Sequence, residues 1–286
     1  MNKTIILNFF RKLLFQNSLA EHLLYYFTNG KSLNAFAAKI PPNYYQYPTN
    51  SIRKIKRNEI NYILDISDYM EWLIYFGIVV KPRKNLYALA KEANVIFDIG
   101  ANVGETTLNI AKIAGESSLI YSFEPSELCY KKLKANIDLN IFKNIKLHQF
   151  GFGEQEQTFY LAPDVENNRG GNRIRVNSEL PHNIKIKQLD NYVKESDILN
   201  IDLIKIDVEG FEFNVLKGAI RTIEKMRPTL FIELNNDNLK QQNTNAKELI
   251  SFLEQYYSNI YNAESKVKIS SKCNLENCHI DIIAKN

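Results

Sequence analysis

Val95-Ile96-Phe97-Asp98-Ile99-Gly100-Ala101-Asn102-Val103-Gly104 is the stretch that decides the fold. A run of apolar residues ends at Asp98 and enters a turn with glycines at positions 100 and 104, and a helical pattern follows over residues 105–114. Short apolar runs separated by amphipathic helices indicate parallel strands that are covered on both faces. The stretch therefore predicts the first strand, turn and helix of an open α/β sheet.

Further strand and helix patterns follow in the same alternation. We expect strands over residues 118–123, 145–150, 202–206 and 229–233, and helices over residues 127–139 and 212–219. Near the C-terminus, residues 267–270 and 279–284 have strand patterns that predict an antiparallel hairpin at one edge. Together these patterns predict an α/β fold, with a Rossmann-like, mostly parallel, doubly wound sheet and a C-terminal antiparallel hairpin.

The first fifty residues differ from the rest of the chain. Residues 3–38 have helical apolar spacing, and the Pro- and Tyr-rich segment 41–48 follows as a linker or a surface loop. Residues 1–90 carry 12 Lys and Arg against 5 Asp and Glu, whereas residues 91–286 carry 24 against 27. We therefore expect a basic helical N-terminal extension over residues 1–50, and a main domain over residues 51–286 whose core begins near residue 92.

The basic extension has several candidate partners. Its charge could meet anionic lipid, nucleic acid or an acidic protein, although a solvated basic face is the more common role of such a segment. Its first apolar run, over residues 5–15, is interrupted by Arg11 and Lys12. This pattern predicts an amphipathic helix that lies on a membrane surface or on the protein itself, rather than a membrane-spanning helix.

The cysteines indicate a reducing compartment. Cys129, Cys273 and Cys278 form no disulfide framework, and a zinc site at Cys273, Cys278 and His279 would lack a fourth ligand. We therefore expect reduced thiols in a cytoplasmic protein, with peripheral contact at the inner face of the membrane as an additional expectation.

The glycine spacing after Asp98 distinguishes between classes of nucleotide site. Glycine permits a sharp turn and leaves the main chain open to a ligand. The spacing Gly100-x-x-x-Gly104 differs from the dinucleotide fingerprint Gly-x-Gly-x-x-Gly, whose amides hold a pyrophosphate. Because S-adenosylmethionine has a sulfonium and an amino-acid tail instead of a phosphate, an acidic residue beside an open turn suits that cofactor better.

A second acidic residue ends the next expected strand. Glu124, within Tyr121-Ser122-Phe123-Glu124-Pro125, lies twenty residues beyond Gly104. At this strand tip a nucleotide-binding unit can offer a carboxylate to both ribose hydroxyls, and two oxygens matched to two hydroxyls form a strong contact. Either motif alone could be a structural turn, but the two in this order predict a nucleoside site.

Three further carboxylates follow the later strands. Asp207 and Glu209 come at the end of the strand that includes residues 203–206, and Glu233 ends the strand over residues 229–233. The carboxyl ends of strands in an open α/β sheet border the ligand crevice. These side chains are candidates to orient an acceptor hydroxyl or take its proton, and Asp207 and Glu233 are candidates to bind a divalent metal such as Mg²⁺. Capping of the helix that begins near Phe211 is the alternative role for Asp207 or Glu209.

Several motifs, in this order, resemble the FkbM family of methyltransferases. They are Phe97 to Gly104, Phe123-Glu124-Pro125, Gln188-Leu189-Asp190, Lys205 to Gly210, Val215 to Ala219 and Pro228 to Leu234. The resemblance covers about residues 60–235. It implies a class I S-adenosylmethionine-dependent methyltransferase domain over residues 51–286, which moves a methyl group to oxygen, often on a sugar of a surface glycan or on a related small molecule.

The resemblance also implies roles for individual residues. The cofactor would be contacted by Asp98, Gly100, Asn102, Gly104, Thr106, Glu124, Pro125, Gly151 and Phe152. In that set, the residues from 98 to 104 would line the methionine part, Glu124 would bind the ribose, and the segment near Gly151 would hold the adenine. The catalytic candidates are Asp207, Glu209 and Glu233.

Other features leave alternatives open. The Arg- and Asn-rich segment 164–181 could close on the acceptor or could be a solvated loop. His148 is expected to be structural, and His182 lies in a loop near the expected pocket. The competing functions are a nucleotide-dependent dehydrogenase, which the glycine spacing disfavours, and a nucleic-acid methyltransferase, which the slightly acidic core disfavours. A catalytically silent module that binds the cofactor, or recruits a membrane or partner, is a third alternative.

Overall fold

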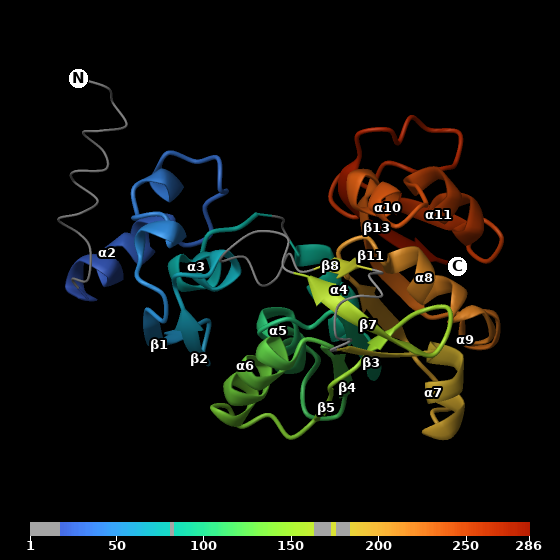
Figure 1. The fold of residues 1–286 in the computed structure, drawn as a ribbon, viewed down its shortest axis with the longest axis horizontal. Coiled ribbons are helices and arrows are strands. Elements are labelled where there is room, and N and C mark those ends of the chain that lie inside the picture. The colour runs from blue at the N-terminus through green and yellow to red at the C-terminus, as the bar shows by residue number, and fades with distance from the viewer. Residues whose placement is uncertain (1–17, 81–82, 163–172, 176–183) are drawn as a thin grey trace. The chain divides into compact units, whose positions relative to one another are not determined.

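The computed structural model of the chain describes residues 18–80, 83–162, 173–175 and 184–286 (Figure 1). Contacts divide these residues into two compact units, and residues 18–80 together with Asp138–Asn140 form the first of them. In this unit a hairpin over residues 52–65 and the helix after it pack with the N-terminal helix. The boundary near residue 50 that the sequence suggests stays a prediction.

The first unit is built on a two-stranded hairpin. Strand β1 (Ile52–Arg57) pairs antiparallel with β2 (Ile60–Asp65), and the two residues between them have left-handed backbones. Two-residue turns of this kind match the natural twist of paired strands. Helix α3 (Tyr69–Phe76) follows, and the carboxylate of Asp68 accepts hydrogen bonds from the main-chain N–H groups of its first turn.

Helix α2 (Ser18–Thr28) attaches to this hairpin through polar groups. The Arg53 guanidinium donates two hydrogen bonds of 2.9 Å to the carboxylate of Glu21. Of the helical pattern expected over residues 3–38, the structure contains α2 and a 3-10 turn, η1 (Ala37–Lys39), and residues 1–17 lie outside the described part. No helix within the described ranges combines the length and the apolar character that crossing a membrane requires.

The Pro- and Tyr-rich segment is a surface loop rather than a linker. It contains a second 3-10 turn, η2 (Tyr44–Gln46). The indole N–H of Trp72 donates to the carbonyl oxygen of Pro42 at 2.8 Å, and Tyr47 is buried. These contacts hold the segment against the first unit.

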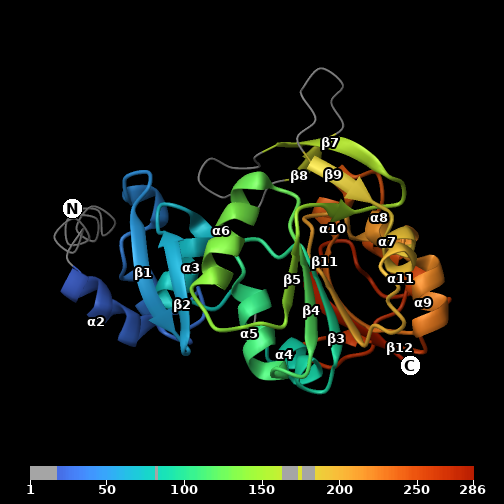
Figure 2. The ribbon, with the colours of Figure 1, turned by 90° about the horizontal axis from the view of Figure 1, so that it is seen from below.

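The second unit contains a seven-stranded sheet (Figure 2). Its strands are β3 (Val95–Ile99), β4 (Leu119–Phe123), β5 (Ile145–His148), β10 (Leu203–Ile206), β11 (Thr229–Asn235), β12 (Asn259–Asn262) and β13 (His279–Lys285). Their order in space is β12-β13-β11-β10-β3-β4-β5. Neighbours from β11 to β5 are parallel, and β13 is antiparallel to both β11 and β12. The mostly parallel sheet with a C-terminal antiparallel hairpin is therefore confirmed.

Helices cover both faces of this sheet. Helices α4 (Lys84–Lys91) and α5 (Glu105–Ala114) contribute to the core on one face, and α6 (Glu127–Asp138) connects β4 to β5. The opposite face packs against α7 (Leu189–Glu195), α8 (Glu212–Lys217), α9 (Ile220–Met226), α10 (Asn236–Gln241) and α11 (Ala246–Leu253).

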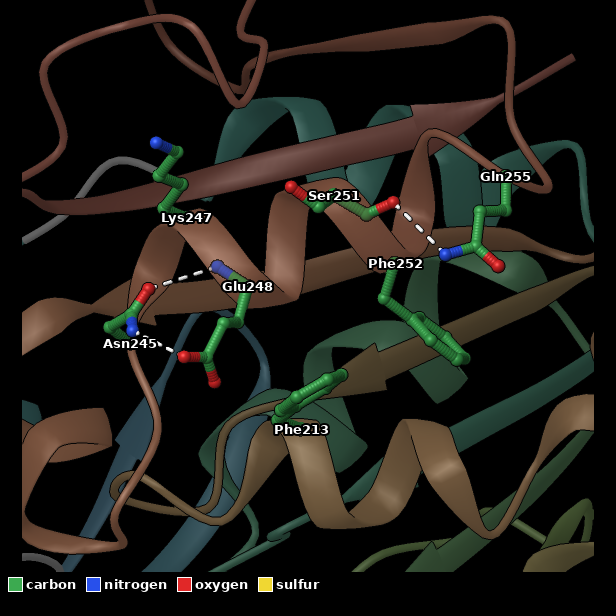
Figure 3. A pocket seen from close by; sticks show the side chains of 7 residues that line it. All are labelled: Phe213, Asn245, Lys247, Glu248, Ser251, Phe252 and Gln255. Atoms are coloured by element: carbon green, nitrogen blue, oxygen red, sulfur yellow. Dashed lines mark hydrogen bonds between the residues drawn. The ribbon is translucent and has the colours of Figure 1, made fainter.

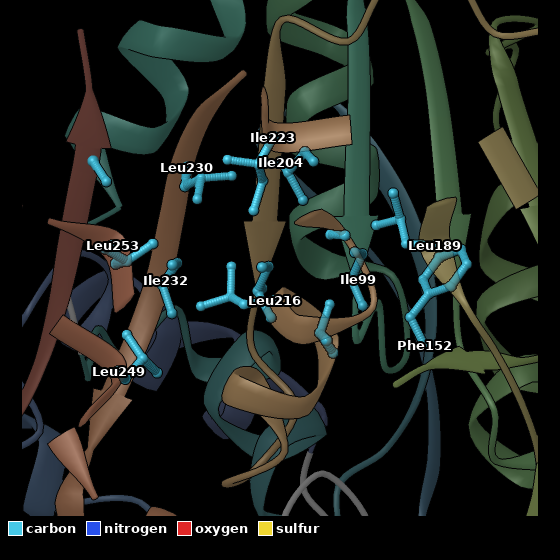
Figure 4. Close-up of a cluster of buried hydrophobic side chains, with 14 of the residues drawn as sticks. Ile99, Phe152, Leu189, Ile204, Leu216, Ile223, Leu230, Ile232, Leu249 and Leu253 are labelled. Atoms are coloured by element: carbon cyan, nitrogen blue, oxygen red, sulfur yellow. The ribbon is translucent and has the colours of Figure 1, made fainter. Parts of the chain in front are cut away.

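Neighbouring residues of β3 belong to two different buried clusters, one on each face of the sheet. Phe97 and Ile99 lie in the larger cluster, whereas Ile96 lies in the smaller one. Figure 4 shows the larger cluster, in which Ile99 and Ile204 from the strands lie near Leu216 from a covering helix. Burial on both faces explains why these strands are apolar at nearly every position.

The edge of the sheet differs from the expected hairpin. The partner of β13 is β12 over residues 259–262, and residues 267–270 do not form a strand. Lys268 makes only an isolated bridge with Tyr261, and Val267 is 61% exposed. Ile269 is partly buried against the larger core cluster, so the segment packs on the sheet's core without forming a strand of the sheet.

A four-stranded sheet lies between β5 and α7 and was not predicted. Its order is β6 (Gly151–Phe152), β9 (Ile184–Lys187), β7 (Gln157–Ala162) and β8 (Arg173–Arg175). Phe159, Ile184, Ile186 and Phe211 form a small buried cluster beneath it. β6 and β8 have only two and three residues, so no period of two can be recognised in them.

Candidate active site

The turn after β3 is held against the end of β10. Gly100 has φ +82°, and a Cβ on this residue would lie 1.9 Å from the carbonyl oxygen of Asp207. Gly104 has φ +95°, and a Cβ there would lie 2.6 Å from Leu133 Cδ1 in α6. Close packing against the main chain therefore requires glycine at position 100, whereas at position 104 the left-handed backbone favours glycine and the end of the Leu133 side chain can shift.

Asp98 is fully buried beneath this turn. Its Oδ2 accepts a hydrogen bond of 2.6 Å from the Thr107 hydroxyl, which also lies 3.0 Å from the Ser122 hydroxyl. Its Oδ1 lies 3.1 Å from Nζ of Lys205. With these contacts the carboxylate fixes the turn to α5 and β10, and its direct contact with a cofactor stays a prediction.

Lys205 links the turn to β10, and the sequence reasoning missed it. Its side chain is 3% exposed, and its ammonium donates to the carbonyl oxygen of Gly100 at 2.8 Å and lies 3.7 Å from Asp207 Oδ2. Burial alone lowers the pKa of Lys205, but the carboxylates of Asp98 and Asp207 outweigh it and raise this pKa above its ordinary value. A signal was present, because a lysine inside an apolar strand is rarely buried unless it is paired.

Glu124 lies at the end of β4 beside the same turn. Its two carboxylate oxygens accept from the main-chain N–H groups of Asn102 and Ser126, each at 2.9 Å. Burial raises the pKa of Glu124 to about 7, although these two hydrogen bonds act in the opposite direction. A carboxylate has about four acceptor positions, so each oxygen retains capacity for a ligand hydroxyl.

Asn102 and Thr106 flank this carboxylate along the chain. Asn102 has φ +50°, and its side-chain oxygen is buried without a hydrogen-bond partner among the residues whose positions are described. Thr106 is buried, and its hydroxyl accepts a short hydrogen bond from Arg83. A buried oxygen that lacks a donor is costly, so Asn102 offers an acceptor to a ligand.

The predicted adenine end lies at β6. A Cβ on Gly151 would lie 3.4 Å from Cγ of Pro125, so these two predicted residues are adjacent. Phe152 is 2% exposed, and its ring packs against that of Phe123 with 4.6 Å between centroids. Since the ring belongs to the core, a ligand at this position would meet the main chain of β6 rather than the phenyl group.

A second cation, Arg83, meets the carboxylate of Asp207. Its Nη2 lies 3.4 Å from Asp207 Oδ2, and its Nη1 lies 3.0 Å from Glu105 Oε2. Burial lowers the pKa of Arg83, but the carboxylates of Glu105 and Asp207 outweigh it and raise this pKa. The Asp207 side chain is 26% exposed and therefore stays accessible to a ligand. No sequence pattern around Arg83 pointed to this role.

Glu209 lies on a tight turn that the carboxylate of Glu212 stabilises. Its φ is +52°, and its Oε2 accepts from the side-chain amide of Asn238 at 2.9 Å. Oε1 of Glu212 accepts from the main-chain N–H groups on either side of Glu209, at 3.0 and 3.1 Å. Burial, followed by the nearby charge of Glu233, raises the pKa of Glu212 to about 8. Glu212 therefore positions Glu209, a role that the sequence did not reveal.

Three carboxylates meet at the ends of β10 and β11. Asp207, Glu209 and Glu233 each offer an oxygen, and these oxygens lie within 4.8 Å of one another. Glu233 Oε1 also lies 3.1 Å from Nε2 of His279. The N-cap residue of α8 is Phe211, whose side chain makes no cap hydrogen bond. The structure thus brings together the three predicted catalytic residues.

His148 is the remaining histidine candidate that lies within the described residues. His148 stacks on Phe123, and its Nε2 lies 3.0 Å from the Tyr192 hydroxyl, which fits the structural role expected for it. Burial lowers the pKa of His148. His182 and most of segment 164–181 lie outside the described residues.

The cysteines also lie apart from the candidate site. Cys129, Cys273 and Cys278 are free thiols. Within the described ranges, the three carboxylates form the group that could hold a metal ion, and neither Cys273, Cys278 nor His279 belongs to it.

A hollow of about 460 Å³ lies between α8 and α11 (Figure 3). Its lining residues are Phe213, Asn245, Lys247, Glu248, Ser251, Phe252 and Gln255. Asn245 caps α11 by accepting from the main-chain N–H of Glu248, so part of this lining serves the helix itself. None of the predicted site residues lines the hollow, and we assign it no role in the chemistry.

Comparison with known proteins identifies the family in which these motifs occur. The family model "Methyltransferase FkbM domain" matches residues 98–260. "Hexuronic acid methyltransferase AglP" of Haloferax volcanii is 25% identical over 137 residues, which are 48% of this chain and 54% of that protein. "2-O-methyltransferase NoeI" of Sinorhizobium fredii is 22% identical over 188 residues, with 61% of this chain and 76% of that protein covered.

The chain spans only about half the length of some curated relatives that it matches. The crystal structure of a methyltransferase FkbM from Methylobacillus flagellatus is similar at 20% identity and a TM-score of 0.41, over 68% of this chain and 44% of that one. The family match itself covers more than half of the chain, and it includes Asp98, Glu124, Asp207 and Glu233. The chain therefore belongs to the FkbM family of methyltransferases and has the class I methyltransferase fold.

Proposed function

We propose that the protein transfers a methyl group from S-adenosylmethionine to a hydroxyl oxygen of a sugar or a related small molecule. The observation that carries this proposal is the presence of two kinds of acidic site at the carboxyl ends of parallel strands of one sheet, on the two sides of β3. Glu124 retains hydrogen-bonding capacity at the end of β4, and three clustered carboxylates lie at the ends of β10 and β11. Group transfer requires the two substrates to be held side by side, and such an edge can do so.

The residues around the β3 turn fit the cofactor. Glu124 offers its oxygens to the two ribose hydroxyls, and the buried oxygen of Asn102 would accept from the ammonium of the amino-acid tail. When bound, the cofactor supplies an electrophilic methyl group on its sulfonium. The chain holds the turn in place for it through the contacts of Lys205 with Gly100 and Asp98.

The clustered carboxylates would receive the acceptor. An alcohol must lose its proton as its oxygen attacks the methyl group, so a base within hydrogen-bonding reach is needed. Asp207 is the first candidate for this base, because it is accessible and its carbonyl contacts the cofactor turn at Gly100. Glu209 and Glu233 would orient the acceptor. The name of AglP, a hexuronic acid methyltransferase, supports a sugar as the acceptor, and that of NoeI, a 2-O-methyltransferase, supports transfer to oxygen.

Binding of adenosylhomocysteine, measured by isothermal titration calorimetry, tests the cofactor half of the proposal. We expect Glu124→Gln to weaken binding by about tenfold to a hundredfold, because the amide loses a charged acceptor oxygen. The pKa of Glu124 is raised to about 7, so its proton is lost as the pH rises from about 6 to about 8. Wild-type affinity should therefore increase over this range, and the affinity of the variant should not.

Glu127→Gln provides a matched control at the start of α6, where Glu127 is exposed and pairs with Lys131. Its affinity should equal that of the wild type. Equal affinities of the wild type and Glu124→Gln, or no binding by the wild type, would contradict the proposed cofactor site. Cofactor binding without methyl transfer to any hydroxylated acceptor would instead favour the silent module.

We also propose that the three carboxylates of Asp207, Glu209 and Glu233 bind a divalent cation where the acceptor would lie. Carboxylate oxygens are the protein ligands that Mg²⁺ and Mn²⁺ prefer, and here they lie close enough to share one ion. We expect Mn²⁺ to bind the purified protein, and Asp207→Asn or Glu233→Gln to weaken this binding by about tenfold. Electron paramagnetic resonance of free Mn²⁺ measures both.

Asp237→Asn, which changes an exposed carboxylate of the neighbouring α10, is the control and should bind Mn²⁺ like the wild type. If Asp207→Asn and Glu233→Gln also bind Mn²⁺ like the wild type, the cation proposal is wrong. Asp207 would then remain the candidate base without a metal.

A further inference from the structure

Helix α2 has one face that is attached to the first unit by polar contacts. Glu21, Leu24 and Thr28 are buried, at helical spacings of three and four residues. The Glu21 carboxylate accepts from Arg53 and from the Tyr75 hydroxyl, and the Thr28 hydroxyl donates to a main-chain carbonyl at the end of α3. The helix is therefore held in place without using most of its large apolar side chains.

The opposite face of α2 is apolar and exposed. Leu19 is 77% exposed, Leu23 60%, Tyr26 67% and Phe27 64%. Positions i, i+4, i+7 and i+8 lie along one stripe of a helix. Single exposed apolar residues are ordinary on a protein surface, but a stripe of four large ones marks an interaction surface.

The charge of the first unit indicates what kind of surface the apolar stripe of α2 binds. Over residues 18–80 most acids are buried within the unit, and these are Glu21, Asp65, Asp68 and Glu71. The lysines of this range are all exposed, and these are Lys31, Lys39, Lys54 and Lys56. Glu59 is the exposed acid of the range. Because the acids are buried and the lysines are not, the solvent-facing charge is much more positive than the composition implies.

The sequence that precedes α2 adds to this charge. Residues 1–17 contain Lys3, Arg11 and Lys12 and no acidic residue. A positive surface with an apolar stripe complements an anionic lipid bilayer, since such a bilayer offers both negative head groups and an apolar interior. A second copy of the chain would cover the stripe but would bring two positive surfaces together.

We propose that the exposed face of α2 lies on an anionic bilayer surface, with Leu19, Leu23, Tyr26 and Phe27 at the boundary between head groups and acyl chains. The exposed lysines of the first unit contribute attraction to the lipid phosphates. The two contributions are individually weak, so binding is reversible and depends on both.

Vesicle flotation with the full chain tests this proposal. The protein should float with vesicles of equal parts phosphatidylglycerol and phosphatidylcholine, and should stay unbound with phosphatidylcholine alone. We expect the double variant Leu23→Ser/Phe27→Ser to bind about tenfold more weakly. Raising the salt to about 1 M should also release the wild type, because the Debye length falls to about 3 Å.

Ile141→Ser/Leu199→Ser is a matched control, since these residues are 86% and 87% exposed in the second unit. It should float like the wild type, and all variants should bind adenosylhomocysteine equally, which separates this test from that of the enzymatic function. Equal flotation of the wild type and Leu23→Ser/Phe27→Ser, or equal wild-type binding to both kinds of vesicle, would overturn the proposal. A dimer in light scattering that Leu23→Ser/Phe27→Ser abolishes, without flotation of the wild type, would also overturn it and assign the stripe to a second copy.

Discussion

Gly100→Ala is expected to lower the free energy of unfolding by about 3–5 kcal/mol. The added methyl group would lie 1.9 Å from the carbonyl oxygen of Asp207, which is a main-chain atom that cannot move without displacing the end of β10. The left-handed backbone at φ +82° adds about 1–2 kcal/mol of this cost. Urea unfolding followed by circular dichroism measures the change as a lower midpoint.

Gly115→Ala is a matched control for the backbone contribution. Gly115 also has φ +82°, but no atom lies within 4 Å of a Cβ placed there. With ψ 177°, this backbone lies in a region that glycine alone adopts readily, so the variant should lose about 1–3 kcal/mol from backbone strain without any clash. Equal losses in the two variants would show that the turn does not press against β10 in the protein.

Lys205→Met is expected to cost about 3–5 kcal/mol, because it leaves a buried carboxylate without its cation. Asp98 is fully buried, and the lysine ammonium 3.1 Å away balances its charge. The carbonyl of Gly100 also loses the donor at 2.8 Å. Lys217→Met is the matched control: Lys217 pairs with Glu154 at 3.3 Å where both side chains are well exposed, so its loss should cost less than about 1 kcal/mol.

A double-mutant cycle separates the ion pair from the packing of the lysine chain. Asp98→Asn removes the carboxylate charge, so it should harm the Lys205→Met background much less than it harms the wild type. We expect a coupling of about 1–3 kcal/mol between the two positions. Strictly additive losses would mean that the two groups do not interact as an ion pair.

The main sheet could be predicted because its strands carry a strong signal of their own. Burial on both faces makes β3 and β4 apolar at successive positions, and turns follow them directly. The four-stranded sheet could not be predicted, because a strand as short as Gly151–Phe152 has no period and pairs with residues far along the chain. The hairpin of β1 and β2 was missed because its turn, Asn58-Glu59, lacks the glycine that usually marks such turns.

Part of the candidate site could be predicted, namely those acidic residues that are recognised by their type and by their place at the end of an expected strand. Glu124, Asp207 and Glu233 needed only these two facts. The pairing of Lys205 with Asp98 required the strand order and register, since the two residues are direct neighbours only because β10 lies beside β3. Arg83 could not be found at all, because it precedes the sheet and its partner Asp207 is 124 residues away.

The contact of Lys205 with the carbonyl of Gly100 joins residues that are 105 apart in the chain. Long-range contacts of this kind form late in folding, after the cost of closing the loop between them has been met. During synthesis, the complete glycine and acidic motifs of residues 98–124 emerge from the ribosome well before β10 does. The proposed nucleoside site therefore takes its final shape only once β10 is available, and a nascent chain that stops short of β10 has the motifs without the contacts that hold the turn.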